Sequence, residues 1–187
     1  MLIYGRHDIT IISGGQTGVD IAGLEAAKSF KIKTGGWAPL GWQTLVGPQQ
    51  ELLESYGLKE HSGGYSKRTK QNIIDSNITL IIARNWKSAG TLLTMRVARE
   101  LNKPFIAMRE DGSPVEAFGF SDDVKKKLSV MNILDEMNVM QDRFKLIADV
   151  IVNYPVINCA GNAEQNAPGI ETEAYNLFYE IFMRISK

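Results

Sequence analysis

The segment that most constrains the fold is a glycine-rich stretch at residues 13–20, Ser-Gly-Gly-Gln-Thr-Gly-Val-Asp, which directly follows the apolar run 9–12. The branched run is typical of a buried strand, and adjacent glycines tolerate φ > 0 and a close approach of the main chain to a ligand. Apolar side chains then recur at helical spacing, at positions 19, 22, 23, 26, 27 and 30. Because the first amides of a helix lack internal partners and carry partial positive charge, this pattern predicts a backbone cradle for a phosphate or carboxylate. A tight strand-to-helix turn without a ligand is the alternative interpretation.

Strand-like and helix-like segments alternate along the 187 residues. Further strands are expected at 31–35, 78–83, 105–108 and 155–160, and helices at 48–56, 67–76, 88–101, 121–136 and 171–185. The alternation predicts a single α/β domain over residues 1–187, Rossmann-like and doubly wound, with a mostly parallel sheet covered by helices on both faces. Ligands of such sheets bind beyond the carboxyl ends of the strands, so the turns after residues 12 and 83 are expected to share one crevice.

Charge and composition exclude several classes of function. Lys and Arg together number 21, as do Asp and Glu, so a generic nucleic-acid or anionic-membrane surface is disfavoured. No apolar stretch approaches the roughly 20 residues that span a bilayer, and no secretory pattern opens the chain, so we expect a cytoplasmic protein. Cys159 is the only cysteine and lies in an apolar run, which is typical of an inert core thiol rather than a metal ligand.

Seven motifs occur in order along nearly the whole chain: residues 13–20, Gly36-Trp37-Ala38-Pro39-x-Gly41, Tyr65-x-x-Arg68-Thr69-x-x-Asn72, Asp75-Ser76, Gly90-Thr91-x-x-Thr94, Lys103-Pro104 and Asn158-x-Ala160-Gly161. As an ordered set they resemble the molybdenum cofactor carrier family. That family lies within the Rossmann-like group that includes the cytokinin-activating phosphoribohydrolases, often mislabelled lysine decarboxylases. The resemblance implies a doubly wound sheet that binds a phosphorylated heterocycle, the molybdenum cofactor (molybdopterin).

The sequence departs from the related patterns at two places. The phosphoribohydrolases carry a glutamate that contributes to N-glycosidic cleavage, and Thr94 stands in its place, so hydrolase activity is not implied. Family members commonly have Pro-Arg-Glu-Ser after the last Ala-Gly, where this chain has Asn-Ala-Glu-Gln at 162–165. The stretch 109–154 is longer than the resemblance leads us to expect, and the sequence assigns it no role.

The candidate ligand residues each have a structural alternative. Arg68 is the strongest anion ligand because a guanidinium forks onto phosphate or carboxylate oxygens, although a solvated surface arginine is the alternative. Asp75 either binds ring N–H groups or terminates its helix, and Trp37 either stacks on a flat ring or seals the core. Gly90 permits close backbone approach, and Thr91 either faces the crevice or follows a cap at Ser88.

The full predicted ligand-binding set is Ser13, Gly14, Gly15, Gln16, Thr17, Gly18, Asp20, Gly36, Trp37, Arg68, Thr69, Asn72, Asp75, Gly90, Thr91 and Thr94. No catalytic residue and no metal ligand is predicted.

Three function classes follow from these residues. The favoured one is a non-catalytic binding or carrier protein for a small phosphorylated ligand, by resemblance the molybdenum cofactor, with a nucleotide-like or ADP-ribose-derived ligand as the nearest variant. The second is a nucleotide N-glycosidase that uses Asp20, Asp75 or Glu164. The third is a ligand-free interaction domain. By analogy with related Rossmann-like proteins, we expect a homo-oligomer, either a dimer or a tetramer.

Overall fold

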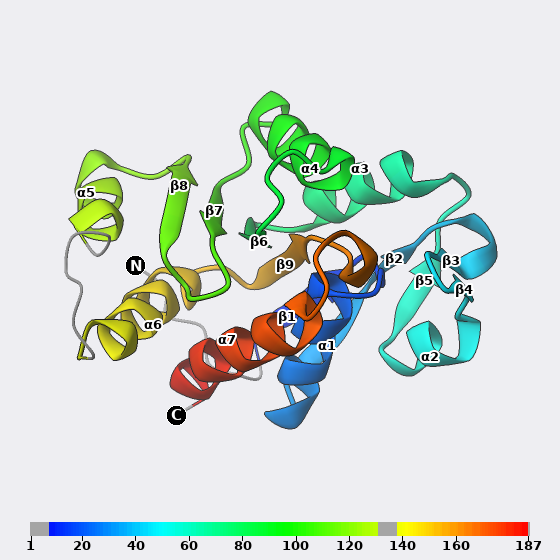
Figure 1. Ribbon diagram of the computed structural model, residues 1–187, viewed down its shortest axis with the longest axis horizontal. Helices are drawn as coiled ribbons and strands as arrows, with labels where there is room; N and C mark the ends of the chain where they lie inside the picture. Colours follow the sequence, from blue (N-terminus) through cyan, green and yellow to red (C-terminus); the bar gives the residue numbers. More distant parts are fainter. Residues whose placement is uncertain (1–7, 131–137, 187) are drawn as a thin grey trace.

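The computed structural model describes residues 8–130 and 138–186, and a seven-stranded sheet lies at its centre (Figure 1). The strand order is β5-β2-β1-β9-β6-β7-β8, and every neighbouring pair is parallel except β7 and β8. The strands are β1 (Thr10–Ser13), β2 (Lys33–Ala38), β5 (Leu58–Glu60), β6 (Ile78–Ile82), β7 (Phe105–Met108), β8 (Pro114–Phe118) and β9 (Val156–Gly161). A separate hairpin pairs β3 (Gln43–Thr44) with β4 (Gly47–Pro48). The predicted Rossmann-like, mostly parallel sheet is confirmed.

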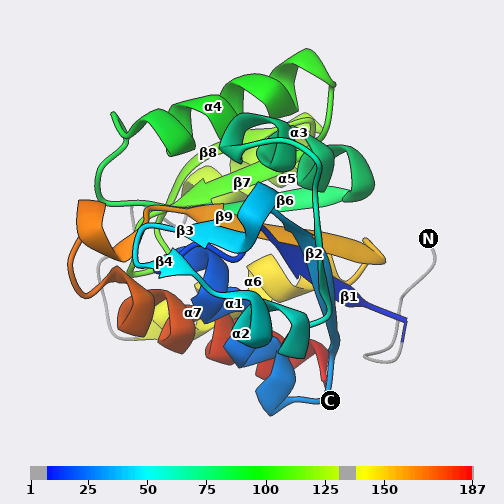
Figure 2. The ribbon, with the colours of Figure 1, turned by 90° about the vertical axis from the view of Figure 1, so that its right-hand side faces the viewer.

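Helices cover both faces of the sheet (Figure 2). They are α1 (Val19–Ser29), α2 (Gln50–Ser55), α3 (Tyr65–Asp75), α4 (Ala89–Glu100), α5 (Asp122–Val130), α6 (Asn138–Ile151) and α7 (Ile170–Ile185), with short 3₁₀ turns η1 (Leu40–Trp42) and η2 (Glu164–Asn166). Strand β6 shows why two layers are needed, because Leu80 packs into the core under α1, α6 and α7, whereas Ile81 packs under α3 and α4. A strand buried on both faces reads as a continuous apolar run, as this one does.

The winding of the chain places a crevice at the centre of the sheet. From β1 the chain passes through α1 to β2 on one side, whereas β9 and β6 lie on the other side of β1. Strand order therefore reverses between β1 and β9, which is the switch point where open α/β sheets bind ligands. Helices α3 and α4 both begin after parallel strands, so they start at the same carboxyl edge of the sheet.

Several elements differ from the sequence predictions. Strand β2 begins two residues later than expected and continues to Ala38, and β5, β8, the β3–β4 hairpin and α6 were not predicted. The predicted helix 121–136 is present as far as Val130, and its remaining residues lie outside the described ranges. The stretch 109–154 now has a structural role, since it supplies β8 at the sheet edge and α6, which packs against α7. Within the described ranges, no helix combines the length and apolarity needed to cross a membrane.

We predict that Phe182→Ala lowers the free energy of unfolding by about 3–5 kcal/mol, because it removes a buried ring and leaves a cavity. Phe182 is fully buried on α7 and its ring stacks on Phe178 with centroids 5.5 Å apart. Tyr179→Ala on the same helix is the matched control and should cost less, because Tyr179 is 38% exposed. Urea denaturation measures both losses, and equal losses would contradict the packing of α7 on the sheet.

Candidate functional site

A cleft of about 780 Å³ lies at the carboxyl edge of the sheet, bordered by α3 and α4 with β9 as its floor. It is lined by half of the predicted set, namely Gly14, Gln16, Asp20, Arg68, Thr69, Asn72, Gly90 and Thr94. The other half does not line it: Ser13, Gly15, Thr17, Gly18, Gly36, Trp37, Asp75 and Thr91. The cleft also gains residues that were not predicted, among them Ser66, Ala89 and Arg96. Both glycine turns thus contribute to one crevice, as the topology predicts.

The first glycine turn does not offer its amides to a ligand. Five successive amides donate to protein oxygens: Gly15 N to Ser13 Oγ at 3.1 Å, Gln16 N to Asp20 Oδ2 at 3.2 Å, Thr17 N to Gln16 Oε1 at 3.0 Å, Gly18 N to Glu171 Oε2 at 2.6 Å and Val19 N to the Asn162 carbonyl at 3.1 Å. Two carboxylates therefore supply the negative charge that the start of α1 favours. The prediction of an open anion cradle at this turn is wrong.

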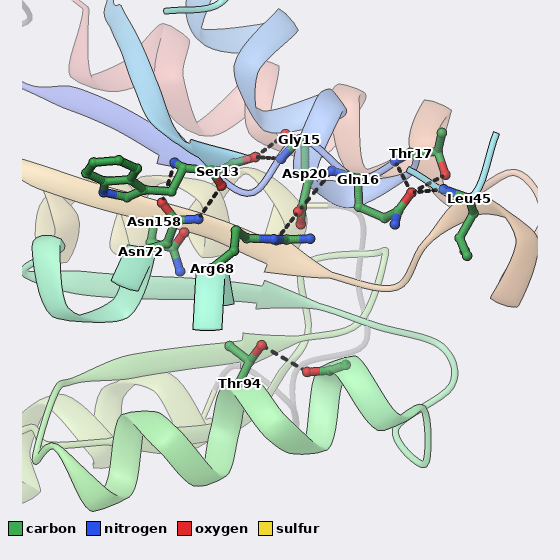
Figure 3. Close-up of polar contacts among 12 residues, drawn as sticks. Ser13, Gly15, Gln16, Thr17, Asp20, Leu45, Arg68, Asn72, Thr94 and Asn158 are labelled. Atoms are coloured by element: carbon green, nitrogen blue, oxygen red, sulfur yellow. Dashed lines mark hydrogen bonds and ion pairs between the residues drawn. The ribbon is translucent and has the colours of Figure 1, made fainter. Parts of the chain in front are cut away.

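The side chain of Gln16 ties this turn to the β3–β4 hairpin (Figure 3). Its Oε1 accepts from the amide of Leu45 at 2.9 Å as well as from Thr17. Leu45 is 51% exposed and lines the cleft. The hydrogen bond therefore holds an apolar side chain beside the first glycine turn.

A buried ion pair joins α1 to α3 inside the cleft (Figure 3). Arg68 Nη1 lies 3.0 Å from Asp20 Oδ2, and the two side chains are only 10% and 8% exposed. Burial raises the pKa of Asp20, and the Arg68 guanidinium and the amides of Gln16 and Gly14 oppose that rise. A Cβ added to Gly14 would lie 1.4 Å from Arg68 Nη1, so glycine is required there by the arginine that crosses it.

The guanidinium of Arg68 is not fully satisfied by this pair. Its Nε is buried and has no hydrogen-bond partner among the described residues. A buried donor without a partner is costly, typically about 1–3 kcal/mol and more for a charged group. Arg68 is thus held by Asp20 through Nη1 and forms part of the cleft wall, while its unpaired Nε is covered by the protein.

The amides that remain available belong to α3 and α4 instead of α1. In the described part of the chain, the main-chain N–H groups of Tyr65, Ser66, Ala89 and Gly90 have no acceptor, and all four residues line the cleft. No heavy atom lies within 4 Å of a Cβ placed on Gly90, so the space beside that turn is open. Two helix beginnings with free amides flank a buried arginine, which is a favourable setting for an anion.

Asn162 holds the start of α4 in place, and sequence reasoning missed it. Its Oδ1 accepts from the amides of Arg84 and Asn85 at 3.0 and 2.8 Å, and its Nδ2 donates to Asn85 O, Ser88 Oγ and Thr91 Oγ1 at 3.0 to 3.1 Å. Ser88 caps α4 by accepting from the Thr91 amide, which confirms the capping interpretation. Thr91 is fully buried in this network, so the prediction that it faces the crevice is wrong. An asparagine after a strand is the only sequence signal for this role.

Trp37 and Asp75 bind each other outside the cleft. The indole Nε1 donates to Asp75 Oδ2 at 2.6 Å. Asn72 Oδ1 accepts from Trp37 N at 2.9 Å, and Asn72 Nδ2 donates to Trp37 O at 3.1 Å. These two hydrogen bonds hold the end of β2 against α3. Gly36 has φ +120° and lies against the main chain of Ser13, which leaves no room for a side chain. These residues support the site without lining it, apart from Asn72.

The remaining predicted groups are also engaged within the protein. Thr94 Oγ1 donates to the Gly90 carbonyl at 2.9 Å, and Glu164 accepts from the amides of Gly169 and Glu171 at 2.5 and 3.0 Å. The thiol of Cys159 lies in the core with its pKa raised well above the ordinary value by burial, which agrees with the inert-thiol prediction. In residues 8–130 and 138–186 no group of His, Cys, Asp and Glu could hold a metal ion.

Comparisons with known proteins agree with this fold. A family model described as "Circularly permutated YpsA SLOG family" matches residues 11–133, a range that holds both glycine turns and Arg68. The chain is also similar to a protein of Syntrophus aciditrophicus SB, known from a crystal structure at 1.45 Å resolution, whose name describes it as a molybdenum carrier. The two share 30% sequence identity over 94% of this chain and 96% of that one, with a TM-score of 0.71. None of the curated proteins matches the chain.

We predict that Asp20→Asn lowers the free energy of unfolding by about 3–5 kcal/mol, because it leaves the Arg68 guanidinium buried without a counter-charge. Adding Arg68→Met removes that charge and should restore most of the loss. The control is Asp149→Asn, which breaks an exposed ion pair with Lys145 and should cost less than about 1 kcal/mol. Urea denaturation measures the series, and an unchanged Asp20→Asn variant would show that the pair carries no such energy.

Proposed function

The chain belongs to the circularly permutated YpsA SLOG family, and we propose that it is a carrier that binds a phosphorylated heterocycle in the α3–α4 cleft without transforming it. The name of the similar Syntrophus protein supports the molybdenum cofactor as that heterocycle. The cofactor is cargo in this proposal, held through hydrogen bonds to its oxygens and ring atoms. A cleft of about 780 Å³ falls within the usual size of small-molecule sites, about 300–1,000 Å³.

The observation that carries the proposal is the guanidinium of Arg68, which lines the cleft and, among the described residues, is hydrogen-bonded through Nη1 alone. Asp20 orients the guanidinium, and the free amides of Ala89 and Gly90 line the same cleft. A phosphate oxygen that accepts from Arg68 would gain a charge-assisted hydrogen bond in a partly desolvated place, where such bonds are strong. The ligand would therefore supply an acceptor to a guanidinium that Asp20 engages only at Nη1.

The charges that line the cleft favour an anion. Its lining contains Arg68, Arg96 and Arg99, and Asp20 is the only carboxylate among the described lining residues. Arg96 and Arg99 form ion pairs with Glu100 and Glu116, which do not line the cleft. Counted over the lining residues alone, three arginines face one carboxylate, which is the sign that favours an anionic ligand.

The arrangement of carboxylates supports a carrier over a nucleotide N-glycosidase. Glycosidic cleavage needs a carboxylate that can act as a base or stabilise positive charge beside the ligand. Asp75 and Glu164 are engaged away from the cleft, and Asp20 is committed to Arg68. Thr94 stands where the phosphoribohydrolases have glutamate, and its hydroxyl is bonded to Gly90.

We predict that freshly purified protein releases a phosphorylated heterocycle on denaturation, which mass spectrometry of the soluble fraction identifies. A molybdopterin derivative would establish the cofactor, and a nucleotide would establish the alternative ligand class. Incubation with nucleoside monophosphates should leave them intact. Release of free base that depends on Asp20 would overturn the non-catalytic assignment.

We predict that Ala89→Pro weakens binding of guanosine 5′-monophosphate about tenfold, because it removes one charge-assisted hydrogen bond to the phosphate. Proline is well tolerated at the first helical position, and Ser88 before it already has the extended ψ of 139° that proline requires. Ala89→Ser keeps the amide and is the matched control.

Calorimetry measures both variants, with circular dichroism as a check that α4 is intact. Equal affinities in the proline and serine variants would show that the start of α4 does not bind the phosphate.

A further inference from the structure

One side chain in the floor of the cleft is not explained by the fold. Asn158 lies on β9, in register with Ile12 of β1 and Thr79 of β6, and it is only 3% exposed. Its Nδ2 donates to Thr79 Oγ1 at a long 3.3 Å. Its Oδ1 accepts no hydrogen bond within the described part of the chain, although the residue lines the cleft.

A polar amide is unusual at this position in a central strand. Central strands of parallel sheets are buried on both faces and consist mainly of branched apolar residues, as β6 does here. The Asn158 oxygen is not closed off from the cleft, and a ligand that covers it without donating to it would remove its hydration without compensation. The neighbouring amide in the cleft, Asn72, avoids this because both of its polar atoms are bonded to Trp37. Of the two buried asparagines in the cleft, Asn158 is therefore the one that retains an acceptor for a partner from outside the chain.

Asn158 lies some distance from the beginnings of α3 and α4, where the phosphate is proposed to bind. It precedes Gly161 by three residues along β9, which corresponds to about 10 Å of strand. Gly161 lies at the carboxyl edge of the sheet, in register with Ile82. Ile82 is the last residue of β6, the strand that precedes α4. A ligand with its phosphate at the beginnings of α3 and α4 would therefore extend its ring inward along β9, toward Asn158.

We propose that Asn158 is a specificity-determining residue that accepts a hydrogen bond from a ring N–H group of the bound heterocycle. The inference rests on the proposed function and adds a ligand class to it: phosphorylated heterocycles that carry an N–H donor on the ring edge. Rings without such a donor leave the buried oxygen unpaired and bind more weakly. Sites that contain a buried hydrogen-bonding group reject analogues that lack its partner for this reason.

The test compares three phosphorylated probes by calorimetry on the full chain. Guanosine 5′-monophosphate has N–H donors on its purine ring, and purine riboside 5′-monophosphate has the same purine skeleton without them. Ribose 5-phosphate has no heterocyclic base to reach Asn158. The wild-type protein should bind the guanine compound about tenfold more tightly than the purine riboside compound, the ratio expected for one buried hydrogen bond.

Asn158→Leu should abolish that ratio while leaving the affinity for ribose 5-phosphate unchanged. It should also leave the thermal midpoint of unfolding nearly unchanged, because the side chain of Asn158 makes only the long hydrogen bond to Thr79 within the described residues; a purely structural asparagine would instead lower the midpoint. Thr79→Val is the control, since it removes the other partner of Asn158 but should preserve the ratio between the two purine compounds.

The outcomes separate this inference from the proposed function. Equal binding of the two purine compounds by the wild-type protein overturns the role of Asn158, even if Asn158→Leu does not fold. Survival of the ratio in Asn158→Leu overturns it as well. Failure of all three probes to bind instead removes the proposed phosphate site, and with it the basis for this inference.

Discussion

The buried pair of Asp20 and Arg68 is the interaction on which the arrangement of the site depends. It joins the first turn of α1 to α3 across the carboxyl edge of the sheet, and it requires glycine at position 14 because the guanidinium occupies the space of a side chain. Buried ion pairs are stable only when their hydrogen bonds are nearly complete. Here Asp20 Oδ2 accepts from both Gln16 N and Arg68 Nη1, so one carboxylate oxygen fixes the guanidinium in the wall of the cleft.

Asp20 also bears on which helix beginnings are open to the proposed ligand. A glycine turn before a helix is ordinarily the place to expect a phosphate. In this chain Asp20 and Glu171 accept from the amides of the α1 turn, so the positive end of that helix is neutralised from within. The open helix beginnings are those of α3 and α4, and Asn162 holds the second of them against the end of β9. The proposed ligand site therefore lies on the opposite face of the sheet from α1.

Much of this fold could be predicted from the sequence, whereas the hydrogen-bond partners of the amides in the turn before α1 could not. Apolar runs identified β1, β6 and β7, and the serine before α4 indicated its cap, because these signals are local. The partner of the Gly18 amide is Glu171, 153 residues away, and no local pattern reveals such a contact. Strands β5 and β8 lie at the sheet edges, and their runs of buried and exposed residues are too short or too mixed to indicate a strand. Helix α6 was detectable, since positions 144, 147, 148 and 151 are apolar at helical spacing.

The central claim is that an anionic group binds between α3 and α4 and not at the α1 turn. A crystal structure of the protein with ribose 5-phosphate tests it most directly. The account predicts that the phosphate lies within hydrogen-bond distance of the Arg68 guanidinium and of the Ala89 or Gly90 amide, with the pair of Asp20 and Arg68 intact. A phosphate seated on the amides of residues 15–18, with Asp20 or Glu171 displaced, would contradict it.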